Sequence, residues 1–181
     1  MKYAQIRHMD ISNGENVGVA LFVQGCHFHC ENCFNSETWD FNCGKKWTKD
    51  IKEQFFKLID RPYIKRVSIL GGEPLEPLNM PDICNLIFEI KEKFPTKTIW
   101  LYTGYTFDYL KEMYKTYQFA FSPYNEWIVR WDIIKMCDVL VDGQYIDSER
   151  DITLKWRGSK NQRVIDVQKS LSENKIVLYC D

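Results

Sequence analysis

The sequence lacks long hydrophobic runs and an excess of charge of one sign. Its longest uninterrupted apolar stretch, Val17 to Val23, is far shorter than the roughly 20 residues with which a helix crosses a bilayer, so no transmembrane helix is expected. The 24 basic and 25 acidic side chains leave a formal net charge of −1. Because no global positive field results, we expect neither nucleic acid nor a membrane surface among the partners.

The sequence also lacks internal repeats, low-complexity tracts and Pro-, Gly- or Ser-rich linkers. Its 181 residues suit one ordinary domain. Hydrophobic residues make up 45% and aromatic residues 15%, which is enough to bury a sizeable core and argues against disorder. We therefore predict a single domain.

A secretory signal is missing as well, because the first ten residues, MKYAQIRHMD, contain no apolar segment of that kind. A cytoplasmic location is the resulting expectation. In that setting, seven cysteines are expected to serve as thiols, metal ligands or redox groups rather than as a disulfide framework, and their odd number agrees.

Strand-like and helix-like patterns alternate along the chain. Short apolar runs predict strands at 17–24, 66–70, 98–102 and 138–141, and amphipathic spacing predicts helices at 49–60, 81–94 and 106–117. The aromatic-rich passage 119–131 gives no clear prediction, and packing against the fold and binding a partner are both open for it. Such alternation is typical of an α/β domain with parallel strands and right-handed crossovers. Ligands of such sheets lie beyond the carboxyl ends of the strands, where Cys26, Gly71, Thr103 and Asp142 would gather.

Three cysteines follow the first predicted strand with the spacing C-x3-C-x2-C: Cys26, Cys30 and Cys33. Thiolates are soft ligands that suit zinc or an iron–sulfur cluster. Structural zinc normally takes four protein ligands, and His27 and His29 are badly placed to supply the fourth because each adjoins a cysteine. Three cysteines on a four-iron cluster would leave one iron open for a substrate. The residues favour the cluster, and a non-catalytic zinc-binding module is the alternative.

A glycine pair with an acidic residue, Gly71-Gly72-Glu73, ends the second predicted strand. Glycines there let a small molecule approach the backbone, and Glu73 suits a cationic group of that molecule. A plain strand-to-helix turn is the more common explanation of a glycine pair alone, so the motif becomes informative only together with the cysteines.

The remaining cysteines and the late basic residues carry no such pattern. Cys43, Cys84, Cys137 and Cys180 have no ligand spacing, and Cys84 and Cys137 are expected to be small buried hydrophobes. A basic strip follows near the end of the sequence, for which solvation and docking of an acidic partner or electron donor are both open: Arg150, Lys155, Arg157, Lys160 and Arg163.

The cysteine spacing, followed by a strand and the sequence GGEP, resembles the radical S-adenosylmethionine superfamily, whose three cysteines bind a [4Fe-4S] cluster. More narrowly, the sequence is similar to the activating proteins of anaerobic ribonucleoside-triphosphate reductases in the segments LFVQGC, CENCFN, LGGEPL, IWLYTGY, DVLVDG and WRGSKNQR. It departs after Asn13-Gly14, where Glu15-Asn16 replaces the usual Pro-Gly. The resemblance spans roughly residues 3–165, so it implies one domain over 1–181 with a C-terminal tail from about 165.

The resemblance implies a fold and a set of ligands. The fold is a single-domain partial, open parallel β/α barrel with helices outside, since a full eightfold barrel needs roughly 250 residues. Cys26, Cys30 and Cys33 would ligate the cluster, and S-adenosylmethionine would chelate the remaining iron through its amino and carboxylate groups. The implied contacts of S-adenosylmethionine are Asn32, Cys33, Phe34, Gly71, Gly72, Glu73 and Thr103.

The resemblance also implies an activity and two protein partners. One electron from the cluster would cleave S-adenosylmethionine to methionine and a 5′-deoxyadenosyl radical, which would take a hydrogen atom from a glycine of the reductase large subunit. No catalytic acid or base is required. A flavodoxin- or ferredoxin-like protein would donate the electron. Activation of another glycyl radical enzyme is the alternative within the same chemistry.

Overall fold

The computed structural model describes residues 1–119 and 125–180. Residues 120–124, which include Phe121 and Tyr124 of the aromatic passage, lie outside the described residues. None of the helices in the described ranges has the length and apolar composition that a membrane crossing requires.

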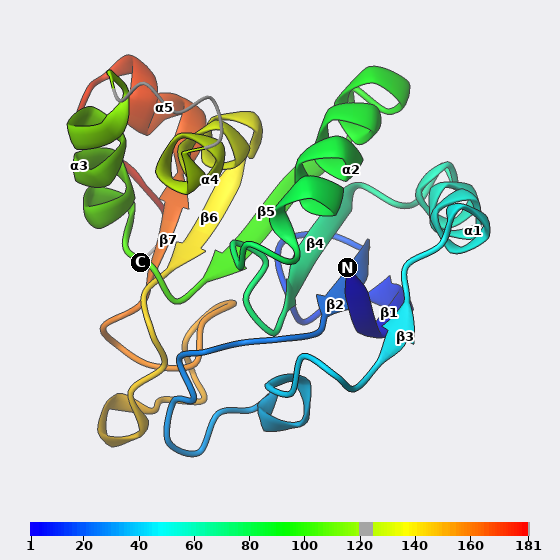
Figure 1. Ribbon diagram of the computed structural model, residues 1–181, viewed down its shortest axis with the longest axis horizontal. Coiled ribbons are helices and arrows are strands. Elements are labelled where there is room, and N and C mark those ends of the chain that lie inside the picture. Colours follow the sequence, from blue (N-terminus) through cyan, green and yellow to red (C-terminus); the bar gives the residue numbers. More distant parts are fainter. Residues whose placement is uncertain (120–124, 181) are drawn as a thin grey trace.

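The described residues form one open sheet of eight strands in the order β3-β1-β2-β4-β5-β6-β7-β8 (Figure 1). The strands β2, β4, β5 and β6 are parallel to one another, and the other four pair antiparallel at the two flanks. The bounds are β1 Lys2–Asp10, β2 Gly18–Val23, β3 Lys45–Lys46, β4 Arg66–Gly71, β5 Thr98–Thr103, β6 Val139–Asp142, β7 Arg163–Asp166 and β8 Leu178–Cys180.

The α/β prediction is confirmed, and the four predicted strands are the parallel centre of the sheet. The expectation of parallel strands throughout needs correction at the flanks. β1 joins β2 through a short loop and β7 follows β6 without an intervening α-helix, and such connections lead to antiparallel pairing. The expected tail after residue 165 contains α5 (Val167–Ser172) and β8, which pairs with β7.

Five α-helices are present in the described part of the chain, and each contributes to one core on one face of the sheet. The helices other than α5 are α1 Lys49–Ile59, α2 Met80–Lys93, α3 Phe107–Tyr117 and α4 Glu126–Met136. The side chains of Thr48 and Thr106 cap α1 and α3, because each oxygen accepts a hydrogen bond from a main-chain N–H of the first turn. The three predicted helices are thereby confirmed.

Alternation along the strands separates two faces. In β4, Val67 and Ile69 belong to the core under the helices, whereas Leu70 packs on the opposite face with Phe22. That opposite face is contacted by loop and C-terminal residues, including Trp156 and Tyr179 against Trp100. Helices therefore cover one face, and loops cover the other.

The strand register brings the predicted site together. Val23 pairs with Gly71, so the cysteine loop that leaves β2 begins beside the glycine pair that ends β4. Thr103 at the end of β5 pairs with Asp142 at the end of β6. Figure 1 shows the cysteine loop passing across the carboxyl ends of these strands.

Candidate functional site

A cavity of about 510 Å³ lies between the carboxyl ends of the parallel strands and the loops on the open face. Its volume is in the range of small-molecule sites. Eight of the sequence-predicted residues line it: Cys26, Cys30, Cys33, Phe34, Gly71, Gly72, Glu73 and Thr103. The predicted gathering of these residues at one edge of the sheet is therefore present in the structure.

The cysteine loop bends through two left-handed residues. His29 has φ 47° and Asn32 has φ 53°, a conformation that histidine and asparagine adopt more readily than most residues. The His29 ring stacks on Trp39 at a centroid distance of 4.7 Å, and the main-chain N–H of Cys33 donates to the carbonyl of Cys30 at 3.1 Å. These contacts shape the loop in which all three cysteines line the cavity.

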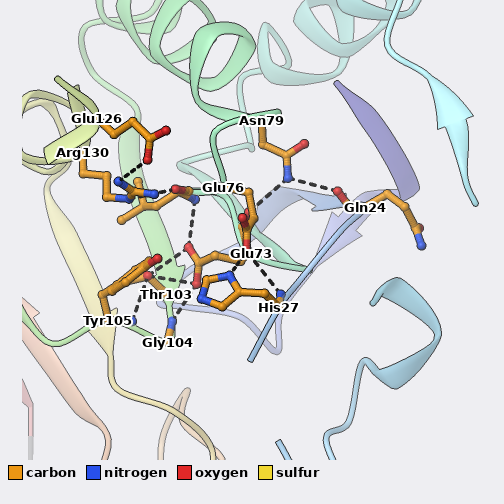
Figure 2. Close-up of polar contacts among 11 residues, drawn as sticks. Gln24, His27, Glu73, Glu76, Asn79, Thr103, Gly104, Tyr105, Glu126 and Arg130 are labelled. Atoms are coloured by element: carbon orange, nitrogen blue, oxygen red, sulfur yellow. Dashed lines mark hydrogen bonds and ion pairs between the residues drawn. The ribbon is translucent and has the colours of Figure 1, made fainter. Parts of the chain in front are cut away.

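The start of the cysteine loop is hydrogen-bonded to the turn that follows the glycine pair. The main-chain N–H of His27 donates to Oε1 of Glu76 at 3.2 Å, and the His27 ring pairs with the same carboxylate (Figure 2). Glu76 is buried, and the neighbouring Leu75 carbonyl accepts a hydrogen bond from Arg130. The chain around Cys26 is thus held against the turn that follows the glycine pair.

The thiols fit the ligands of an iron–sulfur cluster. All three are free, and burial raises the pKa of Cys26 to about 12 and also raises that of Cys30. Their protons must therefore leave when a metal binds. Among the described residues, no three His, Cys, Asp or Glu side chains converge on a single ion position. A four-iron cluster does not require such convergence, because each thiolate binds a different iron.

Glu73 joins the ends of β4 and β5. Its carboxylate accepts hydrogen bonds from the Thr103 hydroxyl at 2.9 Å and from the main-chain N–H groups of Gly104 and Leu75, each at 2.8 Å (Figure 2). Only 1% of the residue is exposed, and burial raises its pKa to about 7. Glu73 therefore places a buried acidic group in the cavity wall while its oxygens are already bonded by the protein.

The glycine pair has a packing role that the sequence did not reveal. Gly71 has φ 105°, and a Cβ there would lie 2.8 Å from the Cα of Phe22. A Cβ on Gly72 would lie 2.4 Å from the carbonyl oxygen of Gly25. The missing side chains thus admit the backbone of β2 and of the cysteine loop, while both glycines also line the cavity.

Asn32 and Phe34, the two neighbours of Cys33, differ in their position relative to the cavity. Phe34 lines the cavity and is 56% exposed. Asn32 is not among the described residues that line it, and its side-chain amide donates to Oδ2 of Asp147 at 2.9 Å. The structure therefore sets Asn32 apart from the other predicted site residues.

Sequence reasoning missed two loops of the cavity wall. Ser12 and Asn13 contribute from the turn between β1 and β2, and Tyr145, Trp156 and Arg157 contribute from the loop between β6 and β7. The signals were present as Asn13-Gly14 and as the segment WRGSKNQR. They carried no spacing from which a role could be derived without the fold.

Comparisons with known proteins agree with this site. Residues 12–165 match the family of 4Fe-4S single cluster domains, a range that includes every residue of the cavity lining except Arg7. This match favours the iron–sulfur interpretation of the cysteines over the zinc alternative.

Individual relatives that match over most of the chain define the protein family more specifically. The chain is 36% identical over 166 residues to the anaerobic ribonucleoside-triphosphate reductase-activating protein of Escherichia coli (strain K12), an alignment that covers 91% of this chain and 97% of the relative. The protein of the same name from Enterobacteria phage T4 is 35% identical, with 91% and 93% covered. That from Vibrio cholerae is 35% identical, with 90% and 96% covered. The chain belongs to the family of anaerobic ribonucleoside-triphosphate reductase-activating proteins, which are activating enzymes.

Proposed function

We propose that this protein uses a [4Fe-4S] cluster and S-adenosylmethionine to install a glycyl radical on an anaerobic ribonucleoside-triphosphate reductase. The observation that carries the proposal is that Cys26, Cys30 and Cys33 line the same cavity as Gly71, Gly72 and Glu73. The family membership supports the reductase as the partner, and it favours that partner over another glycyl radical enzyme.

The three cysteines would hold the cluster, and the remaining iron would be open to the amino and carboxylate groups of S-adenosylmethionine. When bound, the cluster would supply one electron for cleavage of S-adenosylmethionine to methionine and a 5′-deoxyadenosyl radical, which would take a hydrogen atom from a glycine of the reductase.

The protein's own residues would bind and orient the ligand. In its ionised form, Glu73 gives the carboxyl end of β4 a negative charge that attracts the cationic end of S-adenosylmethionine. Phe34 offers an apolar ring in the cavity wall, and Arg7 and Arg157 add positive charge elsewhere in that wall. Asn32 contacts Asp147, so in this proposal it acts on the cysteine loop from outside the cavity.

The open sheet suits a protein substrate. We propose that it is the partial β/α barrel of the radical S-adenosylmethionine type, formed as a single domain over residues 1–181. The parallel centre β2-β4-β5-β6 with helices on one face supports this description. We further propose a flavodoxin- or ferredoxin-like electron donor, no nucleic-acid or membrane partner, and a cytoplasmic location, where the cysteine thiols would remain reduced.

The test is anoxic preparation followed by radical detection. We expect the reconstituted protein to contain about four irons and four sulfides per chain. Reduced and mixed with S-adenosylmethionine and the reductase, it should give the doublet of a glycine-centred radical in electron paramagnetic resonance. A colourless protein with one zinc would overturn the cluster. Cleavage of S-adenosylmethionine without the doublet would overturn the reductase as partner.

A further inference from the structure

The loop between β6 and β7, residues 143–162, contacts the cysteine loop on both sides of Cys33; we call it the clasp segment. On one side, the Asn32 amide donates to Asp147 at 2.9 Å. On the other side, the Phe34 ring packs against Tyr145 at a centroid distance of 5.2 Å, and the Arg150 guanidinium lies 5.1 Å from the ring centroid. Both neighbours of one predicted cluster ligand are therefore held by the same distant segment.

A glycine completes the contact with Phe34. A Cβ on Gly158 would lie 3.0 Å from the Phe34 ring and 3.1 Å from the Tyr145 ring. Those distances are shorter than ordinary van der Waals contact. Gly158 therefore allows the clasp segment to approach the cysteine loop as closely as it does.

Asp147 connects the two contacts. Its Oδ1 accepts from the Tyr145 hydroxyl at 2.7 Å, while its Oδ2 accepts from Asn32. These hydrogen bonds, that of Tyr145 first, lower the pKa of Asp147, so the carboxylate is ionised at neutral pH.

The clasp segment is cross-linked to itself by the polar residues of WRGSKNQR. Gln162 accepts from the main-chain N–H of Gly158 at 2.9 Å and donates to the Gly143 carbonyl at 2.9 Å. Asn161 donates to the Gln144 carbonyl at 2.8 Å, and the Ser159 hydroxyl donates to Asn161 at 2.7 Å. These bonds join the beginning of the segment to its end, which makes it a firm support.

We propose that Asp147, Arg150 and Gly158 are positioning residues that hold the cysteine loop around Cys33 and thereby retain the cluster. The contacts favour this role over a purely solvated basic strip, because Arg150 lies over a cavity-lining ring and Arg157 and Gly158 line the cavity. Outer groups that orient metal ligands commonly change metal affinity about 10- to 100-fold when they are removed. The inference rests on the proposed function, because it presupposes the cluster.

The test compares Asp147→Ala with Asp147→Asn and Asp151→Ala. The first variant removes both acceptor oxygens, and the second removes the charge but keeps an acceptor for Asn32. Asp151 is a matched control in the same segment, because within the described ranges the hydrogen bonds and ion pair of its side chain are with Thr153 and Lys160 alone. Each protein is reconstituted without oxygen, and iron release to a chelator is followed together with the paramagnetic resonance spectrum of the reduced cluster.

We expect Asp147→Ala to release iron about tenfold faster than the wild type and to show a shifted spectrum. Asp147→Asn and Asp151→Ala should stay near the wild type. Release at the wild-type rate from Asp147→Ala would overturn the inference. So would equal acceleration in Asp147→Asn, because it would assign the effect to charge rather than to position.

A second variant, Gly158→Ala, keeps the inference testable if Asp147→Ala does not fold. Gly158→Ala should push on Phe34 and accelerate iron release, and the circular dichroism of the cluster-free protein should match that of the wild type. Unchanged release with a raised KM for the reductase would identify the clasp segment as a docking surface and overturn the inference. A wild type that takes up neither iron nor sulfide would overturn the proposed function, an outcome seen before any variant is compared.

Discussion

At the residue scale, Glu73 should make stability depend on pH. Burial raises its folded-state pKa from 4.5 to about 7, so the folded protein binds this proton more tightly than the unfolded chain does. Between those pH values stability falls as pH rises, and the stabilisation is lost once pH passes the folded pKa. The shift corresponds to a contribution on the order of 3 kcal/mol.

The measurement is urea unfolding of the cluster-free wild type and of Glu73→Gln from pH 5 to pH 8. Because glutamine does not titrate, we expect the unfolding free energy of the wild type to fall relative to the variant by a few kcal/mol over this range. A difference between the two proteins that is the same at every pH would show that Glu73 does not titrate there.

The cysteines should separate into two groups. Cys30 lines the cavity, whereas Cys84 packs against the core under the helices. We expect Cys30→Ala to lose the iron and sulfide of the reconstituted protein and Cys84→Ala to retain both. Iron and sulfide analysis checks this, and equal loss in the two variants would contradict the assignment of ligands.

The sequence predicted that the three cysteines would gather with the glycine pair, because both follow strands whose carboxyl ends meet at one edge of the sheet, and it predicted that Cys137 is buried. The role of the cysteines as cluster ligands stays a prediction. The sequence did not predict that Glu73 would be bonded by Thr103 and Gly104. Those partners lie about thirty residues further along the chain and come near only through the pairing of β4 with β5.

At the scale of elements, the turn between β1 and β2 is held by one buried arginine. Arg66 is 0% exposed, and its guanidinium donates to Asp10 Oδ2 at 2.9 Å and to the carbonyls of Asn13 at 2.6 Å and Glu15 at 3.0 Å. This turn carries the departure from the usual Pro-Gly. It stays fixed because five of its acceptors converge on a single cation: Asp10 Oδ2 and the carbonyls of Asp10, Asn13, Glu15 and Asn16.

Arg66→Met should therefore destabilise the protein by about 3–5 kcal/mol, because it removes the buried countercharge of Asp10 and leaves that carboxylate with the more distant Arg7 guanidinium, 3.9 Å away. Lys65→Met is the matched control. It is the same kind of change one residue earlier, at an exposed position whose amine donates to the Pro62 carbonyl at 3.1 Å. Urea unfolding measures both. A loss below about 1 kcal/mol in Arg66→Met would contradict the role of Arg66.

Elements were predictable where the pattern is local. The strands β2, β4, β5 and β6 are short apolar runs, and α1 and α3 begin at threonine caps. The sequence pattern did not predict the flanking strand β1, because most of its residues are at least partly exposed and its alternation of buried and exposed residues is irregular. The short strands β3 and β8 depend on pairing with distant partners, which local pattern does not report.

At the scale of the whole molecule, one face of the sheet forms the hydrophobic core and the other face forms the cavity. The face under the helices is a continuous apolar core that includes residues of all five helices in the described ranges. The other face carries the cavity, and its wall is built from strand residues and loops rather than from helices. The partition explains how a small domain can keep an opening for a protein substrate without exposing its main core.

Removal of the cluster should therefore destabilise the loops on the cavity face of the sheet and leave the helices on the other face unchanged. Bonds from the thiolates to the cluster would cross-link residues 26–33 of the cysteine loop, and the clasp segment contacts that loop through a few polar and ring contacts. Loss of the cluster would therefore destabilise the cysteine loop directly and the clasp segment through those contacts. The helices keep their core, because none of Cys26, Cys30 and Cys33 belongs to it.

Hydrogen exchange measured by mass spectrometry on the anoxic loaded protein and on its cluster-free form tests this. We expect faster exchange after cluster removal in residues 26–35 and 143–162, with little change in α1, α2 and α4. Cys30→Ala should reproduce the pattern of the cluster-free form, and Cys84→Ala should reproduce that of the loaded protein. Equally faster hydrogen exchange in the helices would mean that the cluster stabilises the entire fold. It would contradict the independence of the helical core from the cavity face.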